Sequence, residues 1–470
     1  MLDNKSATSK KAVPETVGSQ LRRPDGTGAK SNVRWWIVGL LFLTTSLSYL
    51  DRIVFSFLAP EIRQEFHFTP QVYGYMTGSF DIAYAVGFLF AGIWIDRVGA
   101  RIGLASTLAW WSIAAALHAI VRTALPGWRN AEGLSGFAWI LAWLAAPVMS
   151  LAFWRAMLGL GESGNFPAAI KSVAEWFPAK DRALATGIFN AGSNVAATVG
   201  PPMLAILSAA YGWRPCFLVT GSIGLVFAVL WFVTYQHPEQ HPHVNRAELD
   251  YIRSDGVEEE SGPVIRWRKA LMLPETWGFL VARFLTTPVW MMYLWWLPLF
   301  LNDVYKVTPK ERAWAVMGVY VTADIGSVLG GWVSGHFMRR GWAHGRARKA
   351  AMAMCAFCMP VGAMAVLAPN AALAVALVSL AAGAHQGWSA NLYTTISDIF
   401  PRRAVASVVS IGGAAGSLGS FFFASTITGY VVAHWGYRPV FLSMGCFHPI
   451  ALALVHWLMR DMHKVTLQTV

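Results

Sequence analysis

The first half of this sequence concentrates ionisable residues within long apolar stretches, among them Asp51, Arg52, Arg155 and Glu162. A charged side chain at the centre of a bilayer costs at least roughly 2.5–3.5 kcal/mol on insertion scales, so each needs a partner or a function. Arg155 and Glu162 are seven residues apart. On a helix this spacing is about two turns, which places both on one face about 10 Å apart. Asp51 and Arg52 are adjacent and project roughly 100° apart, so at most one of them can point straight at a ligand.

These residue types indicate binding of an anion together with a proton. A guanidinium stays charged and can hold a carboxylate with two hydrogen bonds, so Arg52 and Arg155 are candidate substrate-binding residues. Asp51 and Glu162 are candidate proton-coupling residues. We hypothesise that an incoming carboxylate weakens the hold of an arginine on one of these acids, which then binds a proton, so that the two ligands favour each other. The alternative is a charge network that only stabilises the helix bundle.

The composition indicates that lipid surrounds much of this chain. Of the 470 residues, 55% are hydrophobic and 13% are charged, whereas charged residues make up about a quarter of a soluble domain. The net charge of +12 does not indicate a nucleic-acid partner, because the positive charges fall in the gaps between apolar runs. We therefore expect an all-α membrane protein whose partners are the lipid bilayer and a small organic anion.

A helix that crosses a membrane needs about 20 mostly apolar residues. Between Arg122 and Leu160 we expect one span with an amphipathic lead-in, because two spans would reverse the polarity of everything downstream. The sequence then predicts twelve spans: 35–59, 73–94, 102–121, 145–168, 185–208, 215–235, 275–300, 314–336, 350–367, 372–396, 406–431 and 439–459.

The distribution of basic residues predicts the orientation of these spans. Of the 37 Lys and Arg residues, 26 lie in the tails and gaps on one face, 8 lie in the gaps on the other face, and the remaining three are inside spans. Cytoplasmic loops carry an excess of Lys and Arg. Both termini are therefore expected to be cytoplasmic.

Two segments of the chain recur at nearly the same offset, which indicates a duplication. Phe177-Pro178 corresponds to Phe400-Pro401, 223 residues later, and the prolines of YGWRP at 211–215 and WGYRP at 435–439 are 224 residues apart. Parallel repeats of six helices place one transport site between two bundles. The expected organisation is a disordered tail at 1–33, a six-helix bundle at 34–235, a cytoplasmic loop at 236–270, a second six-helix bundle at 271–460 and a cytoplasmic tail at 461–470.

Five motifs give the chain a family resemblance. GIWIDRVGAR at 92–101 resembles the signature loop of the major facilitator superfamily. YLDR at 49–52, RAMLGLGESGNFPA at 155–168, PVWMMYLW at 288–295 and HQGWSAN at 385–391 resemble the anion:cation symporter family, especially its hexuronate transporters. The resemblance covers about residues 34 to 460. The insertion around 122–148 departs from the usual short link between the third and fourth spans.

The resemblance implies the major facilitator fold and proton-coupled uptake of a sugar acid such as glucuronate or galacturonate. The leading alternative substrates are aldonates such as galactonate, followed by other small organic carboxylates. The coupling ion would be a proton, with no further cofactor. A monomer in a bacterial inner membrane is expected.

Sugar hydroxyls need partners that both donate and accept hydrogen bonds, as amide side chains do. For each candidate the alternative is a hydrogen bond between helices. Trp290, Tyr293 and Trp388 could stack on the sugar ring, although most Trp residues of such proteins belong to interfacial belts. The candidates for the hydroxyls are Asn194, Asn391, His385, Gln386 and Tyr84.

Asp96, Arg97 and Arg101 follow the second span and are expected to gate rather than bind. An acid and a base at the cytoplasmic end of this helix can pair across the bundle interface in the outward-open state. Such a pair must break when the two halves rock.

Other classes of chemistry have weaker support. Cys355 and Cys358 form a C-x-x-C, but it lies in an apolar run without a second ligand pair, so buried thiols are expected rather than a metal or redox site. We find no nucleophile paired with a base, as an enzyme would need, and no Walker-type segment, as an ATP-driven pump would need. A channel would be expected to show a pore loop or an oligomeric filter, and it does not account for the repeat of two six-helix halves.

Overall fold

The computed structural model describes residues 30–121, 146–254, 271–400, 402–460 and 462. The expected tails at 1–33 and 461–470, the insertion at 122–148 and the loop at 236–270 lie wholly or partly outside the described residues. Within the described residues, all regular secondary structure is helical, as the composition predicts.

The described residues of the first half form seven α-helices and one short 3₁₀ helix, η1, at His118–Ile120. Long apolar runs form the α-helices, because a backbone surrounded by lipid must satisfy its hydrogen bonds internally. The α-helices are α1 (Val33–Phe57), α2 (Ala59–Phe66), α3 (Pro70–Leu117), α5 (Pro147–Glu162), α6 (Asn165–Trp176), α7 (Ala179–Tyr211) and α8 (Trp213–Thr234).

The second half follows the short helix α9 (Arg246–Ile252). A π-helical segment, η4, interrupts its fifth crossing between α15 and α16. The elements are α11 (Pro274–Tyr305), α12 (Pro309–Arg339), α13 (His344–Ala363), η3 (Met364–Leu367), α14 (Ala371–Ile399), α15 (Arg402–Gly419), η4 (Ser420–Ile427), α16 (Thr428–Trp435), α17 (Tyr437–Gly445) and α18 (Phe447–Leu458).

The observed helices accommodate the twelve expected crossings. Among the described residues, ten helices are long and apolar enough to cross a membrane. One of them, Pro70–Ile120, is 51 residues long and bends at Gly99, where φ is 80° and ψ is 165°. It therefore contains both the second and the third expected spans. The fourth expected span is divided between α5 and α6, which have 16 and 12 residues.

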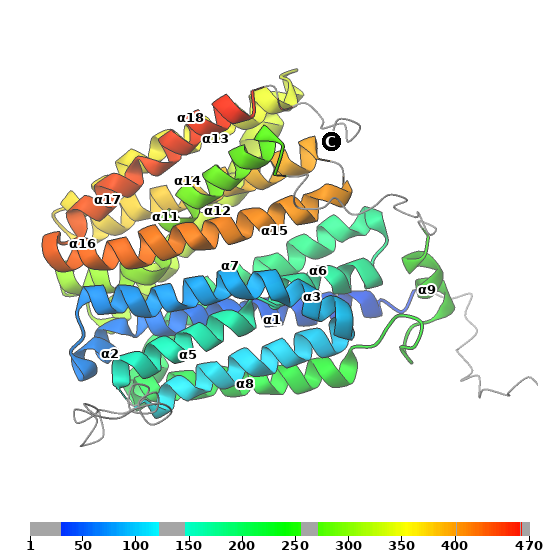
Figure 1. Ribbon diagram of the computed structural model, residues 1–470, viewed down its shortest axis with the longest axis horizontal. Coiled ribbons are helices and arrows are strands. Elements are labelled where there is room, and N and C mark those ends of the chain that lie inside the picture. Colours follow the sequence, from blue (N-terminus) through cyan, green and yellow to red (C-terminus); the bar gives the residue numbers. More distant parts are fainter. Residues whose placement is uncertain (1–29, 122–145, 255–270, 401, 461, 463–470) are drawn as a thin grey trace, which may run out of the picture.

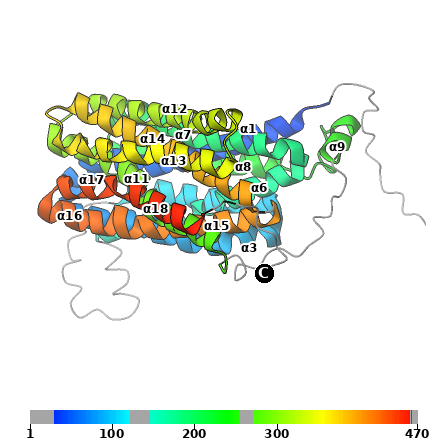
Figure 2. The same cartoon turned by 90° about the horizontal axis from the view of Figure 1, so that it is seen from above.

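The helices run between two distinct ends of the molecule. Figure 1 shows α9 at one end, and α2 and α16 at the other. We call these the α9 end and the α2 end. When the molecule is turned, α9 still lies beyond one end and α16 at the other (Figure 2). The two halves meet where α3 packs against η4 and α16 and where α7 packs against α12.

Two glycines show the repeat in the backbone. Gly212 separates α7 from α8 with φ 81° and ψ 179°, and Gly436 separates α16 from α17 with φ 73° and ψ −169°. A positive φ is adopted readily only by glycine. The recurring YGWRP and WGYRP motifs therefore build the same sharp corner in each half, at the α2 end.

The loop between the halves is fastened to the start of α1. Glu248 of α9 is buried and accepts hydrogen bonds from the backbone N–H groups of Val33 and Arg34 at 3.1 and 3.2 Å. The guanidinium of Arg34 also donates to Glu248 at 2.9 Å. A carboxylate at this position satisfies N–H groups that have no partner within their own helix.

Candidate functional site

An ion pair between α1 and α5 lies in the interior of the first half. Arg52 Nε is 2.5 Å from Glu162 Oε2, and Ser48 Oγ donates to the same oxygen at 3.1 Å. The Arg52 and Glu162 side chains are 3% and 0% exposed. The two helices thus bring together charges that are more than a hundred residues apart in the chain.

Aromatic rings surround the guanidinium of Arg52. Its central carbon lies 4.7 Å from the ring centre of Tyr49, 4.6 Å from that of Tyr84 and 5.2 Å from that of Phe80. A cation is attracted to the face of such a ring. Tyr84, a predicted substrate-binding residue, therefore lies against the ion pair.

Arg155 is enclosed by rings without a carboxylate partner. Its side chain is fully buried, and none of its three guanidinium nitrogens has a hydrogen-bond partner among the residues that the structure describes. The ring centres of Phe55, Phe80 and Trp295 lie 4.9, 4.6 and 4.9 Å from its central carbon. Trp295 belongs to α11, so Arg155 faces the second half of the protein. A buried cation without an anion is costly, and this arrangement suits an anionic ligand.

Asp51 is the second buried charge without a close partner. It is 2% exposed, and neither carboxylate oxygen accepts a hydrogen bond within normal distance from any described residue. The charges of Glu162 and Arg155 act on it, and Thr220 is the polar side chain that faces it. Asp51 can therefore bind a proton without breaking an ion pair.

The predicted residues of the second half gather around a pair of histidines. His385 Nδ1 is 3.0 Å from Nε2 of His448 on α18. Trp290 stacks on His385 with ring centres 5.5 Å apart, and Trp388 meets His448 edge-on at 5.4 Å. Tyr293, on the same helix as Trp290, contacts Phe441 at 6.5 Å.

Three polar candidates differ in how fully their side chains are engaged. Asn391 is buried, and its amide donates to the carbonyls of Gly330 and Gly387 at 2.8 and 2.9 Å. Its oxygen accepts from Arg348 at 3.3 Å, so Asn391 of α14 contacts both α12 and α13 in this conformation. Asn194 Oδ1 accepts from Ser193 at 3.3 Å. Gln386 is half-buried.

The predicted gating residues lie toward the α9 end, and two of them contact partners within the first half. Asp96 Oδ1 is 3.3 Å from Lys171 Nζ, and the Asp96 side chain is 79% exposed. Arg101 Nε donates to the carbonyl of Phe232 at 2.8 Å. Arg97 is exposed. A contact of Asp96 across the bundle interface belongs to the outward-open state and remains a prediction.

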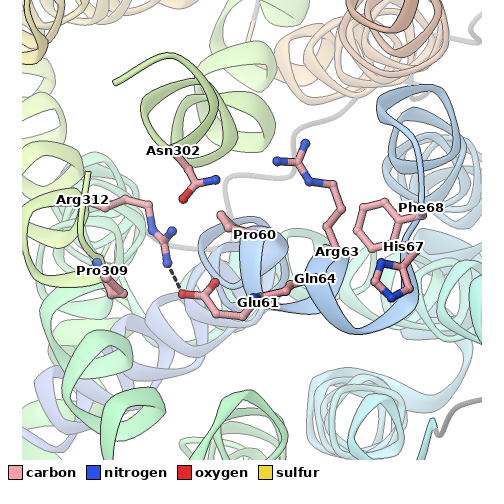
Figure 3. A pocket seen from close by; sticks show the side chains of 9 residues that line it. All are labelled: Pro60, Glu61, Arg63, Gln64, His67, Phe68, Asn302, Pro309 and Arg312. Carbon is pink, nitrogen blue, oxygen red and sulfur yellow. Dashed lines mark hydrogen bonds and ion pairs between the residues drawn. The ribbon is translucent and has the colours of Figure 1, made fainter. Parts of the chain in front are cut away.

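At the α2 end, ion pairs cross between the halves. Arg63 Nη1 donates to Asp303 Oδ2 at 2.9 Å, and Arg312 pairs with Glu61. Figure 3 shows Arg312 reaching Glu61 across an open cavity of about 660 Å³. The cavity is lined by Pro60, Glu61, Arg63, Gln64, His67, Phe68, Asn302, Pro309 and Arg312.

A second layer of contacts closes the bundle below this cavity. Tyr73 of α3 donates to the carbonyl of Trp295 on α11 at 2.6 Å. Ser425 of η4 donates to Asp81 of α3 at 2.8 Å. The α2 end is therefore held shut by contacts between the halves at two depths.

Sequence reasoning missed Asp81, Trp295, His448 and the ion pairs of the α2 end. Asp81 is a carboxyl inside the expected span 73–94, which is the same signal that identified Asp51. His448 likewise lies inside the expected last span. The ion pairs had no local signal, because their partners are about 240 residues apart.

Comparisons with known proteins agree with this architecture. Residues 41–424 match the sequence profile of the Major Facilitator Superfamily. The chain is 30% identical over 438 residues to a hexuronate transporter of Escherichia coli (strain K12), covering 90% of this chain and 93% of the relative. It is 25% identical over 442 residues to a D-galactonate transporter of Escherichia coli O6:H1, covering 92% and 97%.

The fold also matches solved structures. A bacterial homologue of the human lysosomal transporter Spinster, in an inward-facing and occupied conformation, superimposes with a TM-score of 0.68. The match covers 92% of this chain and 98% of that chain at 20% sequence identity. At this identity the likeness concerns the fold.

Proposed function

This chain belongs to the Major Facilitator Superfamily, and we propose that it is a proton-coupled symporter of a sugar-acid anion, a hexuronate such as glucuronate or galacturonate. It is a multi-pass membrane protein and not an enzyme. The proposal places it in a bacterial cytoplasmic membrane with both termini in the cytoplasm, so that the α2 end faces outward.

Arg155 is the observation that carries the proposal. Its guanidinium is fully buried, has no carboxylate partner within the described part of the chain and faces the second half across the ring of Trp295. Leaving such a charge unpaired costs several kcal/mol. A substrate carboxylate would accept two parallel hydrogen bonds from it and remove that cost.

Proton coupling follows from the acids beside this arginine. In this conformation Arg52 pairs with Glu162, while the charge of Arg155 acts on Asp51 and Glu162. A substrate carboxylate bound at Arg155 would screen that charge from both acids, which would then bind a proton more readily. By linkage, a bound proton would favour the substrate to the same extent.

The contacts between the halves support alternating access. Ion pairs and hydrogen bonds close the α2 end in this conformation. The substrate would leave through the α9 end in this state and enter through the α2 end once these contacts separate. Parallel repeats that rock about a central site work in this way.

An aldonate is the second candidate substrate. The similarity to a D-galactonate transporter, which extends over 92% of this chain, favours it. A hexuronate and an aldonate share one carboxylate and several hydroxyls, so Arg155 would serve either. The two differ in whether the sugar closes into a ring that aromatic side chains can cover.

Transport by purified protein in liposomes tests the proposal. We expect saturable accumulation of radiolabelled glucuronate or galacturonate when the outside is acidic, and loss of accumulation when an ionophore collapses the pH gradient. Competition by unlabelled galactonate ranks the two substrate classes. Arg155→Gln should abolish uptake, whereas the exposed Arg346→Gln should not change it. Saturable uptake that does not depend on the pH gradient, or no uptake of any sugar acid, would overturn the proposal.

A further inference from the structure

We propose that Asp81 is a further proton-binding residue of the transport cycle, and that the α2 end closes over its neutral form. The inference rests on the proposed function in that the protein must alternate between open and closed states of this end. It concerns a carboxyl that is separate from Asp51 and Glu162 and that touches the opposite half of the protein directly.

The carboxyl of Asp81 lies at the seam between the halves. It is 3% exposed, and its Oδ2 accepts a hydrogen bond from Ser425 Oγ at 2.8 Å. Asp81 belongs to α3 of the first half and Ser425 to η4 of the second, 344 residues later. Opening the α2 end must break this bond and bring the carboxyl into contact with water.

The helices that carry Asp81 and Ser425 pack closely beside this bond. A Cβ atom on Gly74 would lie 2.4 Å from the carbonyl oxygen of Ser425 and 2.9 Å from Cα of Gly429. One turn further along α3, a Cβ atom on Gly78 would lie 3.3 Å from side-chain atoms of Phe421 and Ser425. Small residues let the two helices approach this closely, and Asp81 is buried where they meet.

The helix that carries Ser425 is irregular at this point. Ser425 lies in η4, the π-helical segment Ser420–Ile427. Short π-helical segments occur frequently at functional sites, because the extra residue per turn alters the direction of neighbouring side chains. Here the irregularity coincides with the residue that meets a buried carboxyl.

A count of charges shows why the neutral form suits closure. The interior of the first half contains the carboxyls Asp51, Asp81 and Glu162 and the guanidiniums Arg52 and Arg155. If all were ionised, the cluster would carry one excess negative charge. A dry interior disfavours such a net charge, and one proton removes it.

Asp81 is the carboxyl of this cluster that meets the second half. The charged groups that act on it are Arg155 of α5 and Arg52 of α1, while η4 presents the neutral Ser425 and α11 the neutral Trp295. Arg52 is already paired with Glu162. Asp81 therefore competes with Asp51 and with the substrate for Arg155, and protonation releases it from that competition.

Accessibility of the seam to a reagent added outside tests the inference without any substrate. Thr77 is fully buried and precedes Asp81 by one helical turn. Thr77→Cys, in a background with the four native cysteines replaced by Ala or Ser, is labelled in right-side-out vesicles with a membrane-impermeant thiol reagent. Asn302→Cys, in the open cavity, corrects for the effect of pH on the reagent.

We expect corrected labelling of Thr77→Cys to rise by about tenfold between about pH 6 and about pH 8, because ionised Asp81 favours the open state. Adding Asp81→Asn should give low labelling at both pH values. Ser425→Ala should raise labelling at the lower pH and keep the dependence on pH. An Asp81→Asn protein with the same pH dependence as its parent would overturn the inference. Failure of sugar-acid uptake would refute the proposed function and leave this result unchanged.

Discussion

Arg63 crosses the bundle interface to pair with Asp303, whose Oδ2 accepts from Nη1 at 2.9 Å. Asp303 also accepts a hydrogen bond from Tyr437, which follows the glycine corner of its own half. In the first half, Glu65 accepts from Trp213, the residue that corresponds to Tyr437, and from Arg214. Glu65 and Asp303 thus occupy similar positions in the two halves, but the arginine that pairs with Asp303 belongs to the opposite half.

We expect the ion pair between Arg63 and Asp303 to stabilise the closed state of the α2 end. Arg63→Gln should favour the open state by about 0.2–1 kcal/mol, the usual range for a partly exposed pair. Labelling of Thr77→Cys from outside measures the shift. The charge-swapped double variant Arg63→Asp with Asp303→Arg should restore the closed state. If it behaves no better than the single variants, the ion pair does not hold this end.

If Glu162 binds the coupling proton, its replacement should separate substrate exchange from substrate accumulation. Glu162→Gln keeps the size of the side chain but removes the group that binds a proton. Exchange of labelled for unlabelled substrate across vesicles should persist, while accumulation driven by a pH gradient should disappear. The exposed Asp250→Asn serves as the matched control and should leave both unchanged. Retained accumulation in Glu162→Gln would refute the assignment.

Glu65 predicts a pH-dependent contribution to stability at the α2 end. The hydrogen bond from Arg214 lowers the pKa of Glu65, which lies on α2 outside the crossing helices. Because the pKa of Glu65 is lower in the folded protein than in the unfolded chain, its ionised form stabilises the folded protein above about pH 4.3, the usual pKa of Glu. This stabilisation is lost as the pH falls through the pKa that Glu65 has in the folded protein.

Thermal unfolding in detergent checks this prediction. Glu65→Gln should be less stable than the parent at neutral pH by about 1 kcal/mol or less, because the pair is about one-third exposed. The difference should vanish at acidic pH. A difference that is the same at both pH values would show that hydrogen-bond geometry, rather than charge, stabilises this contact.

Replacing Asp96 should change the balance between the outward-open and inward-open states rather than the affinity for substrate. In this conformation it pairs weakly with Lys171 of its own half. If it pairs across the interface in the outward-open state, Asp96→Asn should lower the population of that state and slow turnover. Labelling of Thr77→Cys and initial uptake rates measure the two effects. Unchanged values of both would remove Asp96 from the gate.

The parts of the fold that depend on local pattern could be predicted from the sequence. Hydrophobic length gives the crossing helices, and the cost of charge in lipid identifies Asp51, Arg52, Arg155 and Glu162. Helical spacing places Arg155 and Glu162 on one face. The structure then brings Arg52 and Glu162 within 2.5 Å.

The parts that depend on how two helices meet could not be predicted. Asn391 has the amide of a sugar-binding residue, but its donors reach carbonyls of α12 and α14 because small residues bring these helices close. Trp290 and Tyr293 are both candidates for stacking on a sugar ring, and in this conformation their rings contact different partners, His385 and Phe441. Such contacts follow from helix rotation, which the pattern of one sequence does not specify.

The division of the fourth crossing has a mechanical consequence. α5 ends at Glu162 and α6 begins at Asn165, so Ser163 and Gly164 separate the helix that carries Arg155 and Glu162 from the helix that carries Lys171. The backbone of both residues stays in the right-handed helical region. If the crossing bent at this break, Lys171 would move while Arg155 and Glu162 kept their positions against α1.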